Sequence, residues 1–357
     1  MDNTMDIRLN LDLSRMKRLT VPMGTGWLLA ECMEARGKQD LWTNRKPEVL
    51  AALREQAIVQ SVESSNRIEG VTVEAERLRP VVLHGTRPRT RPEEELAGYR
   101  RALEWIFTRR APIEPSPRLV LHLHATAQGG QTGDAGKWKS RDNEIIEFDK
   151  AGQRRTMFVP VKAKHAPGAV DALCRAYPGI RSDDGIPGLL AVASFVLDFL
   201  CIHPFRDGNG RISRLLITAL LQAEGFEVGR YVSLERIVEG SKEEYYGALE
   251  SCSRGWHEGR NEIVPWWNYF LGMLRKAYVE FGDTVEKAPQ RGGKAGMVRS
   301  AVLSRAASFT LAELVHRLPS VSPPMIKNVL GKMKQEGTLK TRGHGRSAVW
   351  EFARKRQ

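Results

Sequence analysis

Near its middle the chain carries the stretch His203-Pro204-Phe205-Arg206-Asp207-Gly208-Asn209-Gly210-Arg211-Ile212-Ser213-Arg214. The segment before it, 188–202, is apolar except for Ser194 and Asp198, and the segment after it, 215–221, is apolar again. Two apolar helices therefore flank a short polar loop, and both helices are expected to be buried. Charged side chains held between core helices indicate a loop that does more than connect them.

The second half of this loop has the chemistry of a phosphate cradle. Gly208 and Gly210 allow backbone conformations with positive φ and a close approach of a ligand. Their N–H groups, with that of Asn209, can form a concave anion-binding nest at the start of the next helix. Arg211 and Arg214 lie three residues apart and so share a face of that helix. Arginine is the side chain best suited to multidentate phosphate contacts.

The first half of the loop supplies the remaining parts of a reaction. Asp207 is a hard oxygen ligand, and Mg²⁺ bound together with phosphate uses only one or two protein carboxylates. His203 has an ordinary pKa of about 6.5, which suits a general base at neutral pH. A base, a metal ligand and a phosphate cradle on one loop indicate transfer of a phosphorus-containing group to a hydroxyl. The alternative interpretation is a basic, glycine-rich connector between core helices.

The loop resembles the Fic motif, His-x-Phe-x-(Asp/Glu)-Gly-Asn-Gly-Arg-x-x-Arg. All eight defining positions match, at His203, Phe205, Asp207, Gly208, Asn209, Gly210, Arg211 and Arg214. The resemblance implies that the protein transfers AMP from ATP to a Ser, Thr or Tyr hydroxyl of a protein. It also implies a role for each motif residue: His203 as the base, Phe205 as the core anchor, Asp207 as the Mg²⁺ ligand, Asn209 and the glycine amides at the α-phosphate, Arg211 at the β-phosphate and Arg214 at the γ-phosphate.

A second pattern lies upstream, at the end of an expected helix over 47–68. Apolar residues recur there at helical spacing, and Gly70 is a natural residue to end the helix. Ser65, Glu69 and Gly70 match the inhibitory pattern (Ser/Thr)-x-x-x-Glu-(Gly/Asn) of regulated Fic proteins. The resemblance implies that Glu69 pairs with Arg214 and occupies the position of the γ-phosphate. This pairing would inhibit the protein, because a carboxylate competes with phosphate for the same donors. The chain would then be of the N-terminally inhibited class, whereas the alternative is an ordinary helix terminus.

A β-hairpin is expected ahead of the motif. Residues 145–148 and 156–159 are short β-prone runs, separated by good turn residues. In Fic proteins a hairpin at this place is the flap that clamps the target segment, and an exposed strand edge suits such sequence-tolerant pairing. The alternative is a surface hairpin without function. The flap residues would be Asp142, Asn143, Glu144, Ile145 and Ile146.

The expected helix 242–253 contains a Tyr pair, which is more often core than a ligand pocket. The resemblance implies that this segment forms the adenine pocket, with Tyr246 and Leu249 as its walls. Many relatives carry Asn seven residues after the second Tyr, where this chain has Ser253. This departure leaves the base selectivity open.

Composition places the chain among globular proteins without a membrane span. Its 357 residues are 41% hydrophobic and 27% charged, and the longest apolar run is too short to cross a bilayer. The four cysteines are scattered, which argues against a disulfide framework or zinc site and favours the cytoplasm. The start of the chain has neither the basic nor the apolar region of a secretory signal.

The net charge of +13 is concentrated at the C-terminal end. Residues 291–357 hold 14 Lys and Arg against three acidic residues, so +11 of the total lies there. Their pattern of helix, helix, longer helix and hairpin resembles a winged helix-turn-helix. Phosphate contacts with DNA would come from Lys327 and Asn328 on the recognition helix and from Arg342 and Arg346 on the wing. The alternative is a module for protein interaction or dimerisation.

The expected fold is therefore mainly α: a Fic helical bundle with a β-hairpin flap and a C-terminal winged-helix domain. Its parts are an N-terminal region at 1–92 with the inhibitory helix at about 47–70, a Fic core at 93–285, a linker at 286–296 and the winged helix at 297–357. Residues 1–50 are expected to form an irregular lead-in with short helices. Residues 71–92 are rich in Pro and Arg, with an extended connector at 87–92.

The leading functional interpretation is an autoinhibited protein adenylyltransferase that uses ATP and Mg²⁺. Its partners would be ATP, a hydroxyl-bearing protein that could be the chain itself, and DNA at the C-terminal module; a homodimer is one candidate assembly. One alternative is a DNA-binding regulator whose Fic body only senses nucleotide, although sensing would not need His203. Another is removal of AMP, or transfer of a different phosphate-linked group, on the same scaffold.

Overall fold

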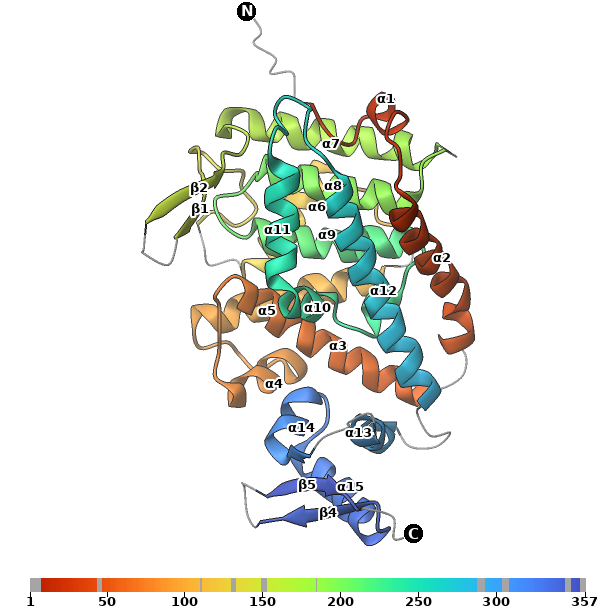
Figure 1. The fold of residues 1–357 in the computed structure, drawn as a ribbon. Helices are drawn as coiled ribbons and strands as arrows, with labels where there is room; N and C mark the ends of the chain where they lie inside the picture. Colours follow the sequence, from red (N-terminus) through yellow and green to blue (C-terminus); the bar gives the residue numbers. More distant parts are fainter. Residues whose placement is uncertain are drawn as a thin grey trace, which may run out of the picture.

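A computed structural model of the chain describes residues 8–43, 47–109, 111–129, 133–148, 153–183, 185–287, 293–303, 308–343 and 348–353 (Figure 1). The described chain is mainly helical, as expected. The helices of the N-terminal half are α1 Leu13–Met16, α2 Met23–Thr43, α3 Pro47–Ile68, α4 Ala75–His84, α5 Arg91–Thr108, α6 Pro117–Ala127 and α7 Ala166–Arg181, with the 3₁₀ turn η1 Ala163–His165. Those that follow are α8 Gly188–Ile202, α9 Asn209–Ala223, η2 Val228–Arg230, α10 Leu234–Gly240, α11 Lys242–Ser253, α12 Val264–Lys287, α13 Gly293–Leu303, α14 Leu311–Arg317 and α15 Pro323–Gln335.

The strands form two small antiparallel sheets. β1 (Ile145–Phe148) and β2 (Arg154–Phe158) make the expected hairpin, with a register shift between Ile145 and Ile146. β3 (Phe309–Thr310), β4 (Leu339–Arg342) and β5 (Val349–Phe352) form a three-stranded sheet in the order β3-β5-β4. The second sheet belongs to the C-terminal module, which lies below the helical body in Figure 1.

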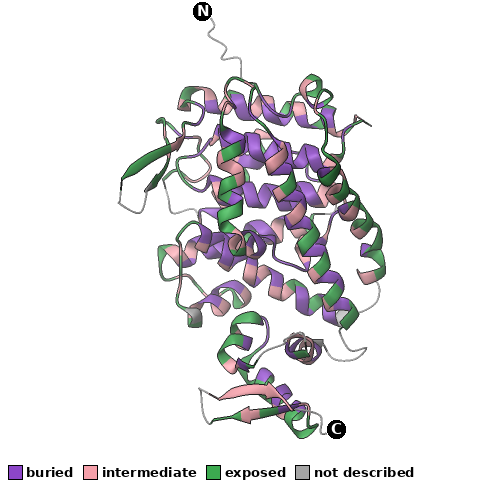
Figure 2. Ribbon diagram, viewed as in Figure 1, coloured by how far each residue is buried: buried purple, intermediate pink, exposed green. Residues whose placement is uncertain are grey.

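The core is built around α8 and α9, which are coloured as buried along most of their length in Figure 2. α8 is apolar on every side, so all its faces must be covered, and α7, α9 and α12 pack around it. The motif loop, His203–Gly208, joins these two buried helices, and the fold therefore holds the loop from both ends. Among the described residues, no helix is both long enough and apolar enough to cross a bilayer.

Asp198 ties the N-terminal segment to α8. Its buried carboxylate accepts hydrogen bonds from Asn10 N (3.0 Å) and Asn10 Nδ2 (2.7 Å), from Leu11 N (2.8 Å) and from Trp256 Nε1 (2.7 Å). Burial raises the pKa of Asp198, although these four donors oppose the shift. A buried carboxylate needs such partners, and here three of the four belong to residues 10 and 11.

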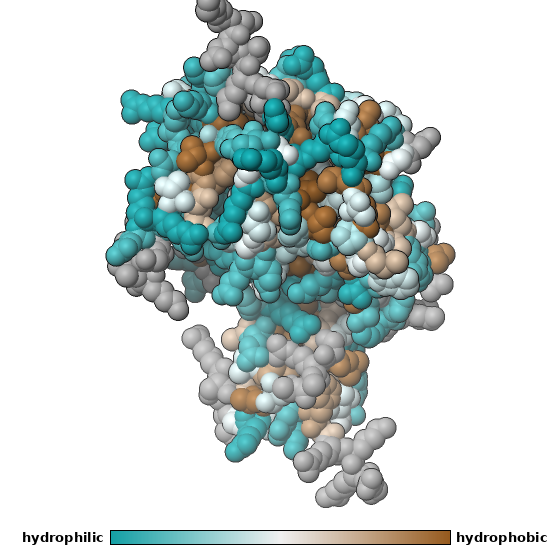
Figure 3. Space-filling model, turned by 45° about the horizontal axis from the view of Figure 1, so that its top comes forward, coloured by the Kyte–Doolittle hydropathy of each residue, from teal (hydrophilic) through white to brown (hydrophobic). Residues whose placement is uncertain are grey.

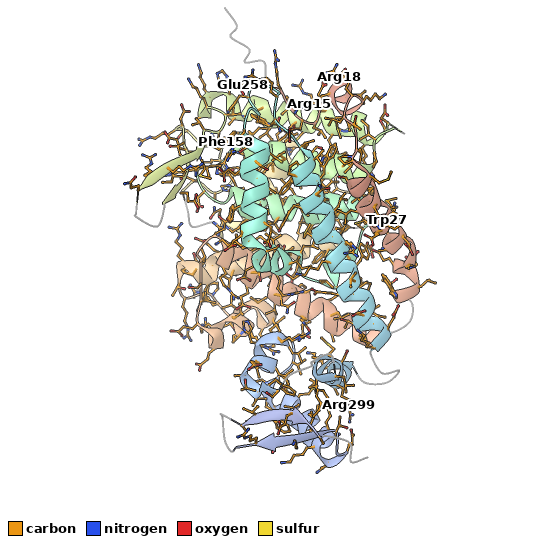
Figure 4. All side chains as sticks on the ribbon, in the orientation of Figure 1. Arg15, Arg18, Trp27, Phe158, Glu258 and Arg299 are labelled. Carbon is orange, nitrogen blue, oxygen red and sulfur yellow. The ribbon has the colours of Figure 1, made fainter. Side chains whose placement is uncertain are left out.

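The expected irregular lead-in at 1–50 is wrong for α2, which is a helix of 21 residues. One side of α2 packs on α12, and Gln39 on that side accepts from the Tyr278 hydroxyl (2.7 Å). The opposite side exposes Met23 and Trp27, and Figure 4 shows Trp27 at the outer edge of the molecule. The packing of α2 on α12 compensates for the three glycines of α2, which lower its helix propensity.

The molecular surface in Figure 3 is largely hydrophilic, with smaller hydrophobic patches on the body.

The Pro- and Arg-rich stretch at 71–92 contains a helix that was not expected, α4, which forms around Pro80; the expected connector at 87–92 is shortened because α5 begins at Arg91. A proline inside a helix costs about 3 kcal/mol. Leu78, Val81 and Val82 recur on one side of α4 and are all buried. Fully burying such a side chain contributes about 1.5–3 kcal/mol, so three of them outweigh the proline.

The C-terminal module is docked on α3 and α4 rather than held away by a long linker. Helix α12 continues to Lys287 and α13 begins at Gly293, which shortens the expected linker at 286–296. The Lys294 ammonium pairs with Glu55 of α3 (2.6 Å), and Arg79 of α4 donates to the carbonyl of Val321 (2.9 Å). A cleft of about 510 Å³ runs between α3, α12 and the module. The module thus covers the side of α3 that carries Glu55.

Candidate active site

The loop between α8 and α9 adopts two left-handed backbone positions. His203 ends α8 at φ 50°, and Gly208 precedes α9 at φ 83°. Among the described residues, His203 is the one non-glycine residue with positive φ. Such positions cost conformational energy and concentrate at functional sites. The φ of Gly208 is one that residues with a side chain rarely adopt, which favours glycine at this position.

Phe205 anchors the loop, as expected from the resemblance. Its fully buried ring stacks on the His124 imidazole at 3.7 Å between centroids and on Trp138 at 5.3 Å. The neighbouring carbonyl of Pro204 accepts from the backbone N–H of Lys139 (2.9 Å). The segment before the flap is therefore fastened directly to the motif loop.

The Asn209 side chain is hydrogen-bonded within the motif loop. Its Oδ1 accepts from the Phe205 N–H (2.9 Å), and its Nδ2 donates to the Phe205 carbonyl (2.8 Å). The amide of Asn209 thus closes the loop on itself. The backbone N–H groups of the first turn of α9 have no acceptor within the helix.

His203 is held as a neutral imidazole with a defined tautomer. Burial, together with the nearby Lys139 ammonium, lowers the pKa of His203 to about 4. Its Nδ1 lies 3.3 Å from the carbonyl of Leu200, which can only accept, so Nδ1 carries the proton. Nε2 is then the acceptor nitrogen, as a general base requires. Lys139 carries no sequence signal that marks it as part of the site, and its own pKa is lowered by burial to about 8.

The second motif arginine meets the end of α3. Arg214 is almost fully buried; its Nε donates to the Ser65 hydroxyl (2.9 Å), and its NH2 donates to the Ser65 carbonyl (3.0 Å) and to Glu69 Oε1 (2.7 Å). A side chain built on Gly210 would overlap the Glu69 carboxylate, so Glu69 lies directly on the glycine turn. Gly70, at φ 78°, ends the helix just beyond. The structure therefore brings the Ser65–Gly70 pattern onto the motif.

The first motif arginine is paired with a carboxylate that the sequence analysis did not single out. The Arg211 NH1 donates to Glu95 Oε2 at 2.5 Å and lies 3.5 Å from the Asn66 amide oxygen. Both Arg211 and Glu95 are buried. Gln128 and Asp207 complete the surroundings at 3.5 and 3.4 Å from the Arg211 NH2. Charged groups so far from water require partners of this kind.

Asp207 is the exposed carboxylate of the loop. Its Oδ1 accepts from the Gly208 N–H (2.7 Å), and its Oδ2 lies 3.4 Å from Arg211. Among the described residues, no group of three or more His, Cys, Asp or Glu side chains could hold a metal by itself. A single accessible carboxylate beside a phosphate cradle fits Mg²⁺ that is bound jointly with phosphate oxygens.

Of the residues expected in the flap, Asn143 lies beside the motif loop. The Asn143 Oδ1 accepts from the Lys139 ammonium (2.7 Å), and its Nδ2 lies 3.4 Å from the Phe205 carbonyl. Asp142 accepts from the Ala163 N–H, and Glu144 from Thr156 on β2. On the same strand, Phe158, which is labelled in Figure 4, stacks on His257. The remaining two flap residues are in β1, where Ile146 is 40% exposed and Ile145 pairs with Phe158.

The expected adenine-pocket residues all lie on α11. Tyr246 is 44% exposed, with the Lys242 ammonium 5.8 Å from its ring centroid. Leu249 packs against the core, and the buried Ser253 donates its hydroxyl to the Glu250 carbonyl of its own helix (3.0 Å). Lys242 also donates to the Ile68 carbonyl at the end of α3 (3.3 Å), which places α11 next to Glu69.

The residues expected to contact DNA are only partly brought together. Lys327 and Asn328 are exposed on α15, and Arg342 is exposed at the end of β4. Arg346 lies outside the described residues. α13 packs between α3 and α15. The module therefore contacts the helical body mainly through α13, rather than through the helix that carries Lys327 and Asn328 (Figure 1).

A model of the Fic/DOC family matches residues 114–221, which include the whole motif loop. A Fido domain-containing protein of Dictyostelium discoideum is 32% identical over 112 residues, which cover 31% of this chain and 71% of that protein. With the loop geometry described above, these matches define the chain as a member of the Fic/DOC family, a family of transferases.

Solved structures match the fold over a longer stretch. A Fic family protein from Desulfovibrio desulfuricans G20 aligns with a TM-score of 0.61 and 20% identity, and covers 95% of this chain and 98% of that one. A Fic domain-containing signaling protein from Bacteroides thetaiotaomicron has a TM-score of 0.60 and 20% identity over 73% of this chain and 98% of that one. Fic-1 from C. elegans aligns with a TM-score of 0.57 and 18% identity, and the alignment covers 74% of this chain and 73% of that one.

Proposed function

We propose that this chain is a protein adenylyltransferase, which moves AMP from ATP to a Ser, Thr or Tyr hydroxyl of a protein. The observation that carries the proposal is that a neutral His203 on the motif loop and two arginines on the first turns of α9 meet at one place. Arg211 and Arg214 are held in place by carboxylates, and Glu69 lies on Gly210 at the start of α9, where a helix N-terminus favours an anion. The flap is fastened beside His203 through Lys139 and would present the target hydroxyl there.

In the proposed reaction, His203 Nε2 accepts the proton of the target hydroxyl. The hydroxyl oxygen forms a bond to the α-phosphorus while the bond from that phosphorus to the bridging oxygen breaks, so pyrophosphate leaves with the electron pair. Arg211, Arg214 and the N–H groups of α9 stabilise the charge on the phosphates. Asp207 would hold Mg²⁺, which when bound neutralises part of the phosphate charge.

Glu69 would act as the brake. Its carboxylate holds Arg214, the side chain proposed for the γ-phosphate, and lies on Gly210. A triphosphate must displace this carboxylate before its γ-phosphate can reach Arg214, because both are anions that need the same donors. The resting protein is therefore proposed to turn over slowly.

Intact-mass measurement tests the reaction. The Glu69→Gly protein, incubated with ATP and Mg²⁺ and with cell lysate proteins as targets, should gain one AMP unit on itself or on a lysate protein. The Glu69→Gly/His203→Ala protein is the matched control and should gain none. A panel of other nucleoside triphosphates covers a different donor, and absence of any adduct across it would reject the proposal. Loss of AMP from a modified target, dependent on Glu69, would instead favour the removal reaction.

We also propose that residues 293–353 form a winged helix-turn-helix that contacts DNA. The order α13, β3, α14, α15, β4, β5 with the sheet order β3-β5-β4 supports a winged helix. α15 would be the recognition helix, since Lys327 and Asn328 are exposed on it, and β4 carries Arg342 toward the wing. The excess of cations in this module supplies the sequence-independent part of DNA affinity.

Salt titration of the full chain tests the DNA proposal. Each lost phosphate contact lowers the slope of log affinity against log salt by about 0.9. The Lys327→Ala/Arg342→Ala protein should therefore show a slope smaller by about 1.8. Lys276→Ala, which removes an exposed cation of α12 on the body, should leave the slope unchanged. Equal slopes for the unaltered chain, the Lys327→Ala/Arg342→Ala protein and the Lys276→Ala protein would contradict DNA contact by the module. Such a result would favour a protein partner for it.

A further inference from the structure

Arg91 lies outside the motif but lines two cavities that the motif residue Asp207 also lines. It is the first residue of α5, after the N-cap Thr90, and its side chain is 66% exposed. Together with Glu69, Asp207 and Arg211 it lines a cavity of about 340 Å³. A second cavity, of about 490 Å³, is lined by Arg91 and Asp207 as well. The side chain thus faces the same open space as the phosphate cradle.

A single carboxylate joins Arg91 to the first motif arginine. Glu95 Oε1 accepts from Arg91 Nε at 2.9 Å, and Glu95 Oε2 accepts from Arg211 NH1 at 2.5 Å. Glu95 is buried and so are the arginine atoms on its inner side, whereas Arg91 approaches from the solvent side. The two guanidinium groups therefore lie next to each other, at opposite oxygens of one carboxylate.

Packing does not account for this arrangement. Arg211 already supplies the buried partner that Glu95 requires. The second pair, between Glu95 and an Arg91 that is mostly exposed, is of the kind that contributes little to stability. What the pair does is orient Arg91: it holds the Nε edge and directs the guanidinium at the cavity beside Asp207.

The charges around the cavity define what would bind there. Arg91 and Arg211 oppose the carboxylates of Glu69, Glu95 and Asp207, so the cavity as it stands is not a strong anion site. Removal of Glu69 and binding of Mg²⁺ at Asp207 would make it one. The motif arginines are both buried, and Arg91 is the accessible cation of this cavity among its described lining residues.

We propose that Arg91 binds the terminal phosphates of the nucleotide and the pyrophosphate that leaves, and so selects triphosphate donors. This inference rests on the adenylyltransferase proposal and adds a residue to it. Arginine suits the role because its planar fork can keep one edge on Glu95 and turn the other toward phosphate oxygens. Glu95 is the positioning residue that orients Arg91 and Arg211 together.

Equilibrium binding tests the inference without any turnover. In the Glu69→Gly protein with Mg²⁺, calorimetry would compare inorganic pyrophosphate with AMP, which has no terminal phosphates. Arg91→Ala should weaken pyrophosphate binding at least tenfold and change AMP binding less than twofold. Arg91→Lys should fall between, because it keeps the charge without the fork. Arg101→Ala is the matched control, since Arg101 is exposed on the same helix and lines neither cavity.

The outcomes separate this inference from the function on which it rests. Pyrophosphate binding that is equal in Arg91→Ala and its parent would overturn the role of Arg91 and leave adenylyl transfer standing. A parent that forms AMP adducts but binds no pyrophosphate would overturn it too. A parent that forms no adduct and binds neither ligand would overturn both. Unchanged thermal unfolding in each variant shows that a loss of binding is local.

Discussion

Replacing His203 should reduce adenylyl transfer by about 10²–10⁴-fold, the usual contribution of a general base, while ATP binding changes little. The base acts only in the chemical step, so kcat falls and the affinity for ATP is preserved. Because burial keeps the pKa of His203 at about 4, its imidazole is neutral at every pH above about 5. The rate should therefore show no acid limb from His203 between pH 6 and 8, where an unshifted histidine would titrate.

The choice of variant matters because His203 has a left-handed backbone. Alanine tolerates such a conformation poorly, whereas asparagine adopts it readily and removes the base. His203→Asn is thus the cleaner test, with His203→Ala beside it. His84→Ala, at an exposed histidine of α4, is the control. If single-turnover rates of His203→Asn match those of the unaltered chain, or if its ATP binding falls as much as its rate, His203 is not the base.

Glu69→Gly should raise the rate of transfer by about 10- to 100-fold. A hydrogen bond between charged groups contributes about 1.5–3 kcal/mol, and this is the interaction that a γ-phosphate must replace at Arg214. Each 1.4 kcal/mol corresponds to a factor of ten. Glycine also costs little helix stability here, because Glu69 lies after the end of α3.

Initial rates of AMP incorporation, measured with saturating target, give the size of the effect. Glu69→Gln should give a smaller increase, because it keeps the shape of the side chain but removes the charge. Glu63→Gln is the control: it removes a carboxylate from α3, the helix that Glu69 follows, but Glu63 pairs with Arg67 and not with the motif. A Glu69→Gly rate no higher than that of the unaltered chain would eliminate the brake.

The sequence was sufficient to predict the elements whose signals are local. The ranges expected for α3, α8 and α11 agree with the structure, because apolar periodicity, turn residues and the motif itself mark their ends. α4 was hidden by Pro80, and α2 by its glycines. In both helices burial against neighbours outweighs a poor local propensity, and such burial is decided by parts of the chain far away in sequence.

The candidate site could be predicted in its motif but not in its supports. Arg211 and Glu95 are 116 residues apart, so no local pattern marks Glu95 as its partner. Lys139 shows no sequence feature that sets it apart from other lysines, although it lies close enough to affect His203. The hydrogen bonds of the Asn209 side chain with Phe205 were not predicted either, because the resemblance assigns Asn209 to the α-phosphate only.

The tie between Asp198 and the first described residues bears on how the protein can be divided. A fragment that starts at the expected core boundary, residue 93, would keep the carboxylate in the middle of α8 but lose the Asn10 and Leu11 donors. Trp256 would be its only remaining donor among those four, and a buried carboxylate stripped of partners is strongly destabilising. Such a fragment is therefore expected to be less stable than the full chain, and affinity tags or cleavage sites belong upstream of Asn10.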